Sequence, residues 1–308
     1  MSSLVNALRQ NLQSVIRGKD HEIDYLIAAF LGGGNVLLND VPGVGKTTLA
    51  RAIAASITGA FRRVQFTPDL LPADILGGAI YNPREGEFHF RRGPIFAQVL
   101  LADEVNRASP RTQSSLLEAM AEGQVSIDGE THPLPQPFWV IATQNPVEYH
   151  GTYPLPEAQL DRFAMQLTLG YPPEREELEI LTRQNRPHPL EDLQPVGTPD
   201  DVLATQAEVR AVHVDEDVAR YMLAVVSATR SDERLELGVS PRGSIALYRM
   251  SQAWAYVEGR TAVSPDDVKA VAVETLAHRL ALETKTKYSG GTRESVVRDL
   301  LAGVKVPV

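Results

Sequence analysis

Residues 35–48 read NVLLNDVPGVGKTT, an apolar run followed by a glycine-rich turn that ends in a lysine and two threonines. A short continuous apolar run is typical of a buried parallel strand, and residues 47–57 favour a helix. A turn in this position directs backbone N–H groups toward phosphate oxygens, and the helix N-terminus adds a partial positive charge. The stretch therefore predicts a phosphate-binding loop in a domain of the α/β class.

The residue types in this loop suit that chemistry. Gly43 and Gly45 let the backbone turn sharply. Lys46 can reach the terminal phosphates, and the Thr47 hydroxyl can bind Mg²⁺. Asp40 stands where the usual pattern has glycine, and an isolated motif of this kind is equally well a plain capped turn. The predicted nucleotide contacts in the loop are Pro42, Gly43, Val44, Gly45, Lys46, Thr47 and Thr48.

A second motif ends the apolar run at residues 99–102 with two acids, Asp103 and Glu104. Alone, this pattern favours a strand followed by a solvated acidic turn. After a phosphate loop, with a strand and a helix between the two motifs, it indicates a hydrolytic site. Asp103 would hold Mg²⁺ through water, and Glu104 would orient and activate the attacking water.

The remaining patterns predict two domains. Alternating strands and helices indicate a parallel sheet covered on both faces, with further strands at residues 61–66, at the end of 95–102, and at 138–143 and 164–169. Beyond two prolines at 172 and 173 the patterns are helical, at residues 173–183, 215–229, 241–257 and 292–302. Thr198 and Ser264 each precede a proline and two acids, as at a helix start. We predict an α/β domain over residues 1–170 and a smaller all-helical domain over 171–308.

Five segments, taken together, resemble the AAA+ ATPases and, within them, the MoxR family. They are VPGVGKT at 41–47, DEVNRA at 103–108, TQSSLLEAM at 112–120, ATQNP at 142–146 and EAQLDRF at 157–163. The tripeptide SPR at 240–242 extends the match into the second domain, and Asp40 looks usual for the family. The resemblance implies a P-loop AAA+ parallel sheet flanked by helices, followed by a small all-helical lid domain.

The resemblance also assigns roles by position. Asn145 resembles the sensor-1 residue that positions water against the γ-phosphate, although a turn-forming Asn before proline is the alternative. Arg162 resembles the arginine finger donated to the ATP of a neighbouring subunit, with a local salt bridge as the alternative. Arg242 resembles sensor 2, which could touch phosphate from a lid helix, or it is a solvated helix start. Ile16 and Gly18 lie where the family packs adenine, or they form a buried turn.

Two hairpins are expected outside this machinery. Residues 76–81 and 87–90 can pair around a turn at 82–86, which resembles the helix-2 insertion of the MoxR clade, near residues 77–92. We expect its tip, at residues 82–87, to contact a client or partner. Residues 124–132 resemble the hairpin before sensor 1, turning at Asp128 and Gly129. Surface loops are the alternative for both segments.

Composition limits the remaining possibilities. The net charge of −9 gives no global attraction to nucleic acid, and the lack of cysteine excludes disulfides and thiolate metal sites. The scattered histidines predict no zinc site. No apolar run is long enough for a membrane helix, no secretory leader is expected, and a cytoplasmic location fits.

The resemblance implies an ATP-hydrolysing, chaperone-like motor that uses ATP/ADP and Mg²⁺. It would form a ring with itself, by default a hexamer. It would remodel or assemble a client protein, or activate that protein's cofactor, with a separate von Willebrand factor A domain protein as partner. The alternatives are an AAA+ nucleic-acid motor, which the net charge disfavours, and a nucleotide-dependent binding switch with little turnover.

Overall fold

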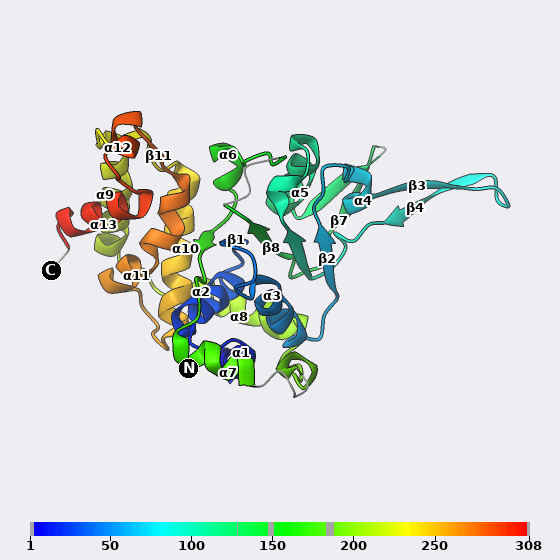
Figure 1. The fold of residues 1–308 in the computed structure, drawn as a ribbon, viewed down its shortest axis with the longest axis horizontal. Helices are drawn as coiled ribbons and strands as arrows, with labels where there is room; N and C mark the ends of the chain where they lie inside the picture. The colour runs from blue at the N-terminus through cyan, green and yellow to red at the C-terminus, as the bar shows by residue number, and fades with distance from the viewer. Residues whose placement is uncertain (1–2, 128, 147–150, 183–187, 307–308) are drawn as a thin grey trace.

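A five-stranded parallel sheet forms the centre of the molecule (Figure 1). The computed structural model describes residues 3–127, 129–146, 151–182 and 188–306. The strand order is β2-β5-β8-β1-β9, and the strands are β1 Val36–Asn39, β2 Phe61–Gln65, β5 Val99–Asp103, β8 Trp139–Gln144 and β9 Met165–Leu167. The strands predicted from apolar runs are thereby confirmed, close to their predicted bounds.

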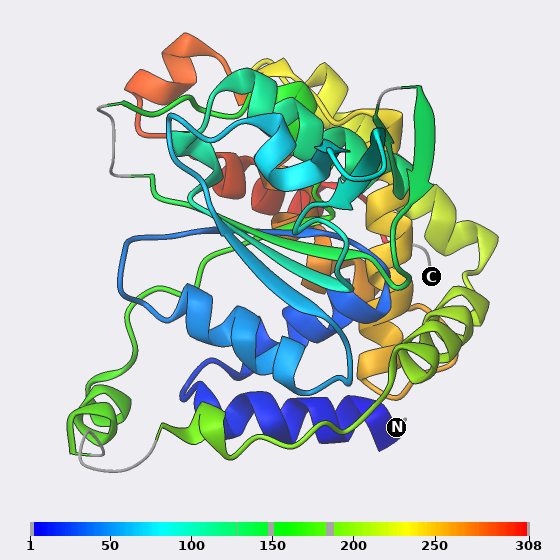
Figure 2. The same ribbon diagram turned by 90° about the vertical axis from the view of Figure 1, so that its right-hand side faces the viewer.

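Successive residues of the central strands face two separate cores. On β1, Val36 and Leu38 belong to one buried cluster and Leu37 to the other. The first cluster includes the apolar faces of α1 Ser3–Val15, α2 Asp20–Leu31 and α3 Lys46–Ala55. The second packs against α4 Pro72–Leu76 and α5 Pro110–Glu122. Helices therefore cover both faces of the sheet, as Figure 2 shows, which explains why the central strands β1, β5 and β8 are almost continuously apolar.

The C-terminal part of the chain is mainly helical. Its longer helices are α7 Glu174–Thr182, α8 Pro199–Ala211, α9 Glu216–Ser231, α10 Pro241–Val257, α11 Pro265–Leu276 and α13 Arg293–Gly303. Thr198 and Ser264 form capping boxes at the starts of α8 and α11, as their flanking residues predict. Arg183, the expected end of the first helix, lies outside the described residues. No helix in the described ranges has the length and apolar character needed to cross a bilayer.

Short elements complete this arrangement. They are α6 Glu157–Leu160, α12 Thr284–Tyr288, and the 3₁₀ turns η1 Val105–Arg107, η2 Pro189–Glu191 and η3 Ala277–Arg279. Strands β10 Leu235–Leu237 and β11 Ala281–Leu282 pair antiparallel within the helical part. The helical patterns did not predict this pairing, because two or three residues from distant segments carry no detectable period.

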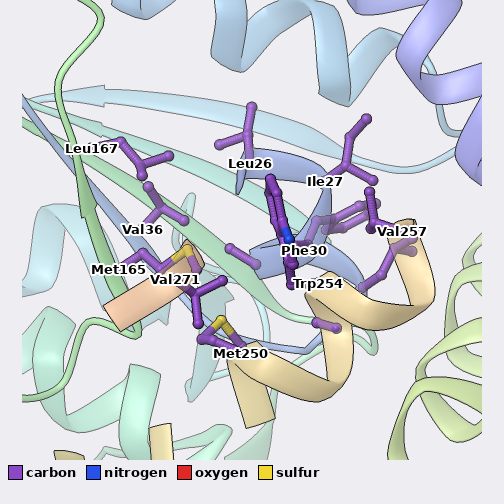
Figure 3. Packing of buried hydrophobic residues seen from close by; sticks show 14 of the residues in the cluster. Leu26, Ile27, Phe30, Val36, Met165, Leu167, Met250, Trp254, Val257 and Val271 are labelled. Carbon is purple, nitrogen blue, oxygen red and sulfur yellow. The ribbon is translucent and has the colours of Figure 1, made fainter. Parts of the chain in front are cut away.

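A continuous apolar core joins the sheet to the helical part (Figure 3). Met250 and Trp254 of α10 lie in the same cluster as Phe30 of α2 and Met165 of β9. Trp254 also packs its ring 4.8 Å from that of Tyr25 on α2. Packing on α2 fixes where α10 begins relative to the sheet. The predicted boundary between residues 170 and 171 stays a prediction.

Both expected hairpins are present. Strands β3 Gly77–Asn82 and β4 Glu87–Arg92 pair in register from Gly77 with Arg92 to Asn82 with Glu87, and they project from the body (Figure 1). The second hairpin consists of β6 Gln124–Ile127 and β7 Glu130–Pro133, and its turn residue Asp128 lies outside the described residues. Phe90 of β4 stacks on His132 of β7, with centroids 4.1 Å apart. The base of the long hairpin is therefore anchored on the second hairpin.

Candidate nucleotide-binding site

The predicted phosphate loop connects the end of β1 to the start of α3. Gly43 and Gly45 have φ angles of 87° and 96°, in the left-handed region that glycine adopts readily. A Cβ atom built on Gly43 would meet no atom within 4 Å, so this side of the loop is open. Gly45 directly precedes the first turn of α3, whose N–H groups are available to an anion. The backbone therefore has the form that phosphate binding requires.

Asp40 anchors the start of this loop. Its side chain is almost fully buried, and its two oxygens accept hydrogen bonds from backbone N–H groups. Oδ1 accepts from Val41 at 2.7 Å, and Oδ2 accepts at 2.6 Å from Gly170, three residues after the end of β9. Asp40, which replaces the usual glycine, thus connects the phosphate loop to the segment that follows β9 through hydrogen bonds.

Lys46 lies along the loop. Its Nζ donates to the carbonyl oxygens of Asp40, Val41 and Gln144, the last two at 3.2 and 3.4 Å. Burial lowers the pKa of Lys46, and the nearby carboxylates, Asp40 first, act in the opposite direction. Phosphate oxygens can take the place of these carbonyls as acceptors.

Asp103 ends β5 beside the phosphate loop, and three groups converge on its carboxylate. Thr143 donates to Oδ1 at 2.5 Å, and Thr47 Oγ1 lies 3.4 Å from Oδ2. Arg63 of β2 donates to Oδ2 from Nη2 at 2.7 Å and from Nε at 3.1 Å. The hydroxyl of Thr47 and the carboxylate of Asp103 are hard oxygen ligands on one spot, so they fit Mg²⁺.

Glu104 has an unusual backbone conformation. Its φ and ψ are 56° and 51°, and it is the one non-glycine residue with positive φ in the described ranges. Its N–H donates to Thr143 Oγ1 at 2.8 Å. Its Oε2 accepts from Gln65 Nε2 at 2.7 Å and Arg107 Nη1 at 2.9 Å. Strain of this kind concentrates at functional sites, where the surrounding contacts maintain it.

Sequence patterns missed part of this site. They assigned no role to Arg63, Gln65 or Thr143. The strand pattern could have indicated Arg63 and Gln65. Residues two apart on a strand face the same side, and these two lie at the end of β2, which pairs with β5 next to the two acids. Arg63, Gln65 and Thr143 are therefore residues of the site that the sequence patterns did not identify.

One cavity collects these groups. It is lined by Pro42, Gly43, Gly45, Lys46, Thr47, Thr48, Arg63, Gln65, Asp103, Glu104, Thr143 and Asn145. Asn145, the predicted sensor, thus faces the loop, and its carbonyl accepts a hydrogen bond from Asn106 Nδ2 at 3.3 Å. Val44 is part of the same loop, half-buried against the core.

The predicted adenine segment lies beside this cavity. Ile16 Cδ1 is 3.6 Å from where a Cβ on Gly45 would stand. Gly18, with φ 67°, turns close to Pro173 and Glu176 at the start of α7. The structure thus brings Ile16 to the loop, and the contact of Ile16 and Gly18 with adenine stays a prediction.

The other two predicted arginines lie elsewhere. Arg162 and Arg242 line a second cavity, together with Asp161, Arg249 and Arg279, and no residue lines both cavities. Arg162 Nη1 donates to the carbonyl of Leu117 at 2.7 Å. Arg242 is 3.9 Å from the Asp161 carboxylate, because the packing of α10 on α2 places the start of α10 beside Asp161. Its contact with phosphate stays a prediction.

Comparison with known proteins identifies the family. Residues 35–165 match the model of the ATPase family associated with various cellular activities (AAA), and residues 227–300 match the AAA lid domain. Chaperone MoxR1 of Mycobacterium tuberculosis is 40% identical over 305 residues, covering 96% of this chain and 80% of that protein. The chain belongs to the MoxR family of AAA+ ATPases.

Two further relatives match over nearly the whole length of the chain. The uncharacterized protein YeaC of Bacillus subtilis is 50% identical over 97% of this chain and 93% of its own. A crystal structure of a candidate ATPase from Cytophaga hutchinsonii superposes with a TM-score of 0.91 at 37% identity, covering 99% of this chain and 96% of that one. The predicted fold, an AAA+ parallel sheet flanked by helices and followed by a lid, is confirmed.

Proposed function

We propose that this MoxR-family protein hydrolyses ATP at the cavity between the phosphate loop and the end of β5. The observation that carries the proposal is the convergence of Lys46, Asp103 and Glu104 on that one cavity. Lys46 and the loop N–H groups bind the phosphates. The Glu104 carboxylate, which lines the same cavity, accepts the proton of the attacking water.

Mg²⁺ fits the oxygens of Thr47 and Asp103. When bound, it neutralises the charge that develops on the phosphates. Arg63 and the Thr47 hydroxyl both lie at Oδ2 of Asp103, so a metal held there would compete with the Arg63 ion pair. Thr143 donates to the other oxygen, Oδ1, and would keep the carboxylate oriented.

The site is proposed to be completed by a second copy of the chain. Arg162 and Arg242 lie in a cavity separate from the phosphate loop, so they do not serve the ATP of their own chain in this arrangement. Guanidinium groups suit the charge that spreads over phosphoryl oxygens during transfer. A closed ring, by default of six copies, would bring each arginine pair to the next subunit's ATP.

Partner binding is proposed for the long hairpin. Ile80, Tyr81 and Phe88 are exposed on it, and Phe88 is 71% exposed. Tyr81 and Phe88 pair across the strands with ring centroids 5.2 Å apart, so they present one apolar surface beside the tip. We propose that it contacts a client protein, or a separate von Willebrand factor A domain partner, during remodelling or activation.

Phosphate release by the Glu104→Gln variant tests hydrolysis. We expect ATP to bind as in the wild type and release to fall by about 100- to 10,000-fold, because an amide cannot take the proton. Glu122→Gln, at an exposed position at the end of α5, is the matched control and should match the wild type. Wild-type turnover by Glu104→Gln would refute the assignment.

A further inference from the structure

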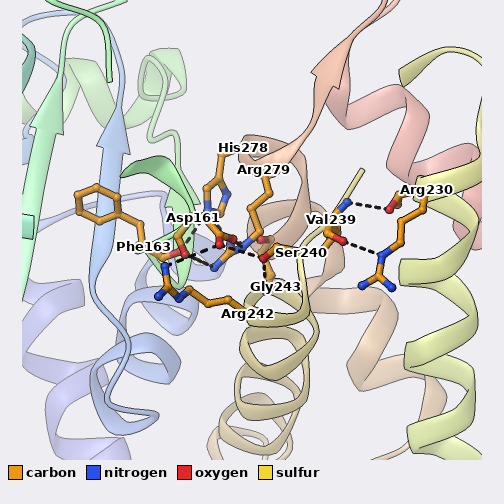
Figure 4. Close-up of polar contacts among 11 residues, drawn as sticks. Asp161, Phe163, Arg230, Val239, Ser240, Arg242, Gly243, His278 and Arg279 are labelled. Atoms are coloured by element: carbon orange, nitrogen blue, oxygen red, sulfur yellow. Dashed lines mark hydrogen bonds and ion pairs between the residues drawn. The ribbon is translucent and has the colours of Figure 1, made fainter. Parts of the chain in front are cut away.

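A buried arginine of the lid binds the backbone on both sides of Arg162. Arg279, in η3, has a side chain only 2% exposed. Its Nη2 donates to the carbonyl of Asp161 at 3.4 Å and to that of Phe163 at 2.7 Å. These two residues flank Arg162 in sequence, so one guanidinium fixes the peptide segment that carries the Arg162 side chain (Figure 4).

The Asp161 carboxylate links the same segment to α10. Its Oδ1 accepts from Arg279 Nε at 3.0 Å, and its Oδ2 accepts from the Ser240 hydroxyl at 2.9 Å. Ser240 is the N-cap of α10, and Arg242 follows it in the first turn, 3.9 Å from Asp161. A single carboxylate thus connects the Arg162 segment, the start of α10 and η3.

The charges in this network are set by burial. Burial lowers the pKa of Arg279 to about 10, and Asp161 opposes that shift, so the guanidinium stays protonated at neutral pH. Burial, and then the Arg279 charge, hold the pKa of His278 well below its ordinary value. His278 Nε2 lies 2.7 Å from Arg279 Nη1, and neutral imidazole can accept that hydrogen bond. Arg279 therefore has directed acceptors on several sides.

The apolar core that α10 shares with α2 would hold the lid against the sheet even without this network. A buried ion pair stabilises a fold little compared with apolar residues of the same size, but its hydrogen bonds fix the orientation of the groups that they join. The exposed fractions of the side chains agree with an orienting role. The side chain of Arg242 is 56% exposed, whereas those of Asp161 and Arg279 are 16% and 2% exposed.

We propose that Asp161 and Arg279 are positioning residues, which hold Arg162 and Arg242 together as one unit that a subunit presents to the ATP of its neighbour. The inference rests on the proposed function. Neither residue touches the nucleotide. Each acts through the two arginines, so its loss should impair donation of the arginines but not the subunit's own phosphate loop.

Mixing experiments with Asp161→Asn separate positioning from general damage. Alone, this variant should bind ATP normally with a kcat about 100-fold lower, the scale of a 1 Å misplacement. Mixed with Lys46→Ala protein, which keeps its arginines, it should regain turnover at interfaces that combine its loop with an intact arginine pair. Mixed with Arg162→Ala protein it should not, because neither subunit offers a positioned finger.

A matched control and a second variant keep the test decisive. Asp232 forms a comparable lid ion pair with Arg234 at 2.8 Å, with its side chain 11% exposed, and Asp232→Asn should keep kcat. If Asp161→Asn does not assemble, Arg279→Lys carries the same mixing test, since an ammonium retains the charge but cannot reach both flanking carbonyls.

Three results would overturn the inference. These are a kcat for Asp161→Asn equal to that of Asp232→Asn, no rescue by Lys46→Ala, or failure of both Asp161→Asn and Arg279→Lys to assemble. The last would assign the pair to folding. Rescue between Arg162→Ala and Lys46→Ala is measured in parallel. If that pair also fails to restore turnover, the shared site itself is refuted, which distinguishes the two claims.

Discussion

At position 104 we predict that glycine makes the protein more stable than alanine does, which is the reverse of the usual order. At most positions glycine is less stable than alanine, by about 0.5–1 kcal/mol, because it loses more backbone freedom on folding. Glu104 has φ 56° and ψ 51°, where any residue with a Cβ pays roughly 1–2 kcal/mol. Glu104→Gly relieves that strain and Glu104→Ala does not.

The two variants lose the same side-chain contacts, to Gln65 and Arg107, so those contacts cancel in the comparison. The balance leaves Glu104→Gly more stable than Glu104→Ala by about 1 kcal/mol, or roughly 2 °C in Tm for a chain of this size. Both variants should lose hydrolysis by about 100- to 10,000-fold, since neither has a carboxylate.

Urea and thermal unfolding measure the difference, and Glu118 supplies the control. Glu118 is exposed in the middle of α5, where glycine should be less stable than alanine by about 1 kcal/mol. The Gly–Ala difference should therefore change sign between residues 118 and 104. An alanine at 104 as stable as glycine would show that the backbone is not left-handed there, and the account of how Glu104 is aimed would fail.

Three further outcomes are expected. Lys46→Ala should weaken ATP binding, measured by nucleotide titration, because the phosphates lose a charged donor; unchanged affinity would remove Lys46 from the site. Because His278 is neutral when folded and protonates on unfolding, the unfolding free energy should fall as the pH drops below about 6.5, by at most about 1.4 kcal/mol per pH unit for this proton. Denaturant unfolding from pH 7 to 5 should show that component in the wild type and not in His278→Asn. Replacing residues 82–87 with a Gly-Ser turn should leave ATPase within a few-fold of wild type while abolishing partner capture by the Glu104→Gln form; capture that persists would place the contact elsewhere, with residues 126–130 the next candidate.

The parts of the site that sequence predicts are local ones. In residues 40–48 and 99–104, the functional side chains occupy a few consecutive positions, directly after the strand that positions them. The central strands could be predicted for a similar reason, because burial on both faces makes β1, β5 and β8 almost continuously apolar.

The parts that sequence does not predict depend on distant segments. Arg279 meets Asp161 across 118 positions, and nothing around residue 279 distinguishes it from an ordinary helix-end arginine. The place of Arg242 beside Asp161 is likewise a consequence of how α10 packs on α2, which a role transferred by motif does not describe.

Turnover in mixed assemblies of Lys46→Ala and Arg162→Ala tests the central claim, a site built by two subunits, most directly. Each variant alone should be nearly inactive, Arg162→Ala while still binding ATP. In an equimolar mixture, random assembly in a ring places an intact loop against an intact finger at about one interface in four, so phosphate release should reappear. No recovery, with mixed assembly demonstrated by differential labelling, would contradict the claim, as would full activity of Arg162→Ala by itself.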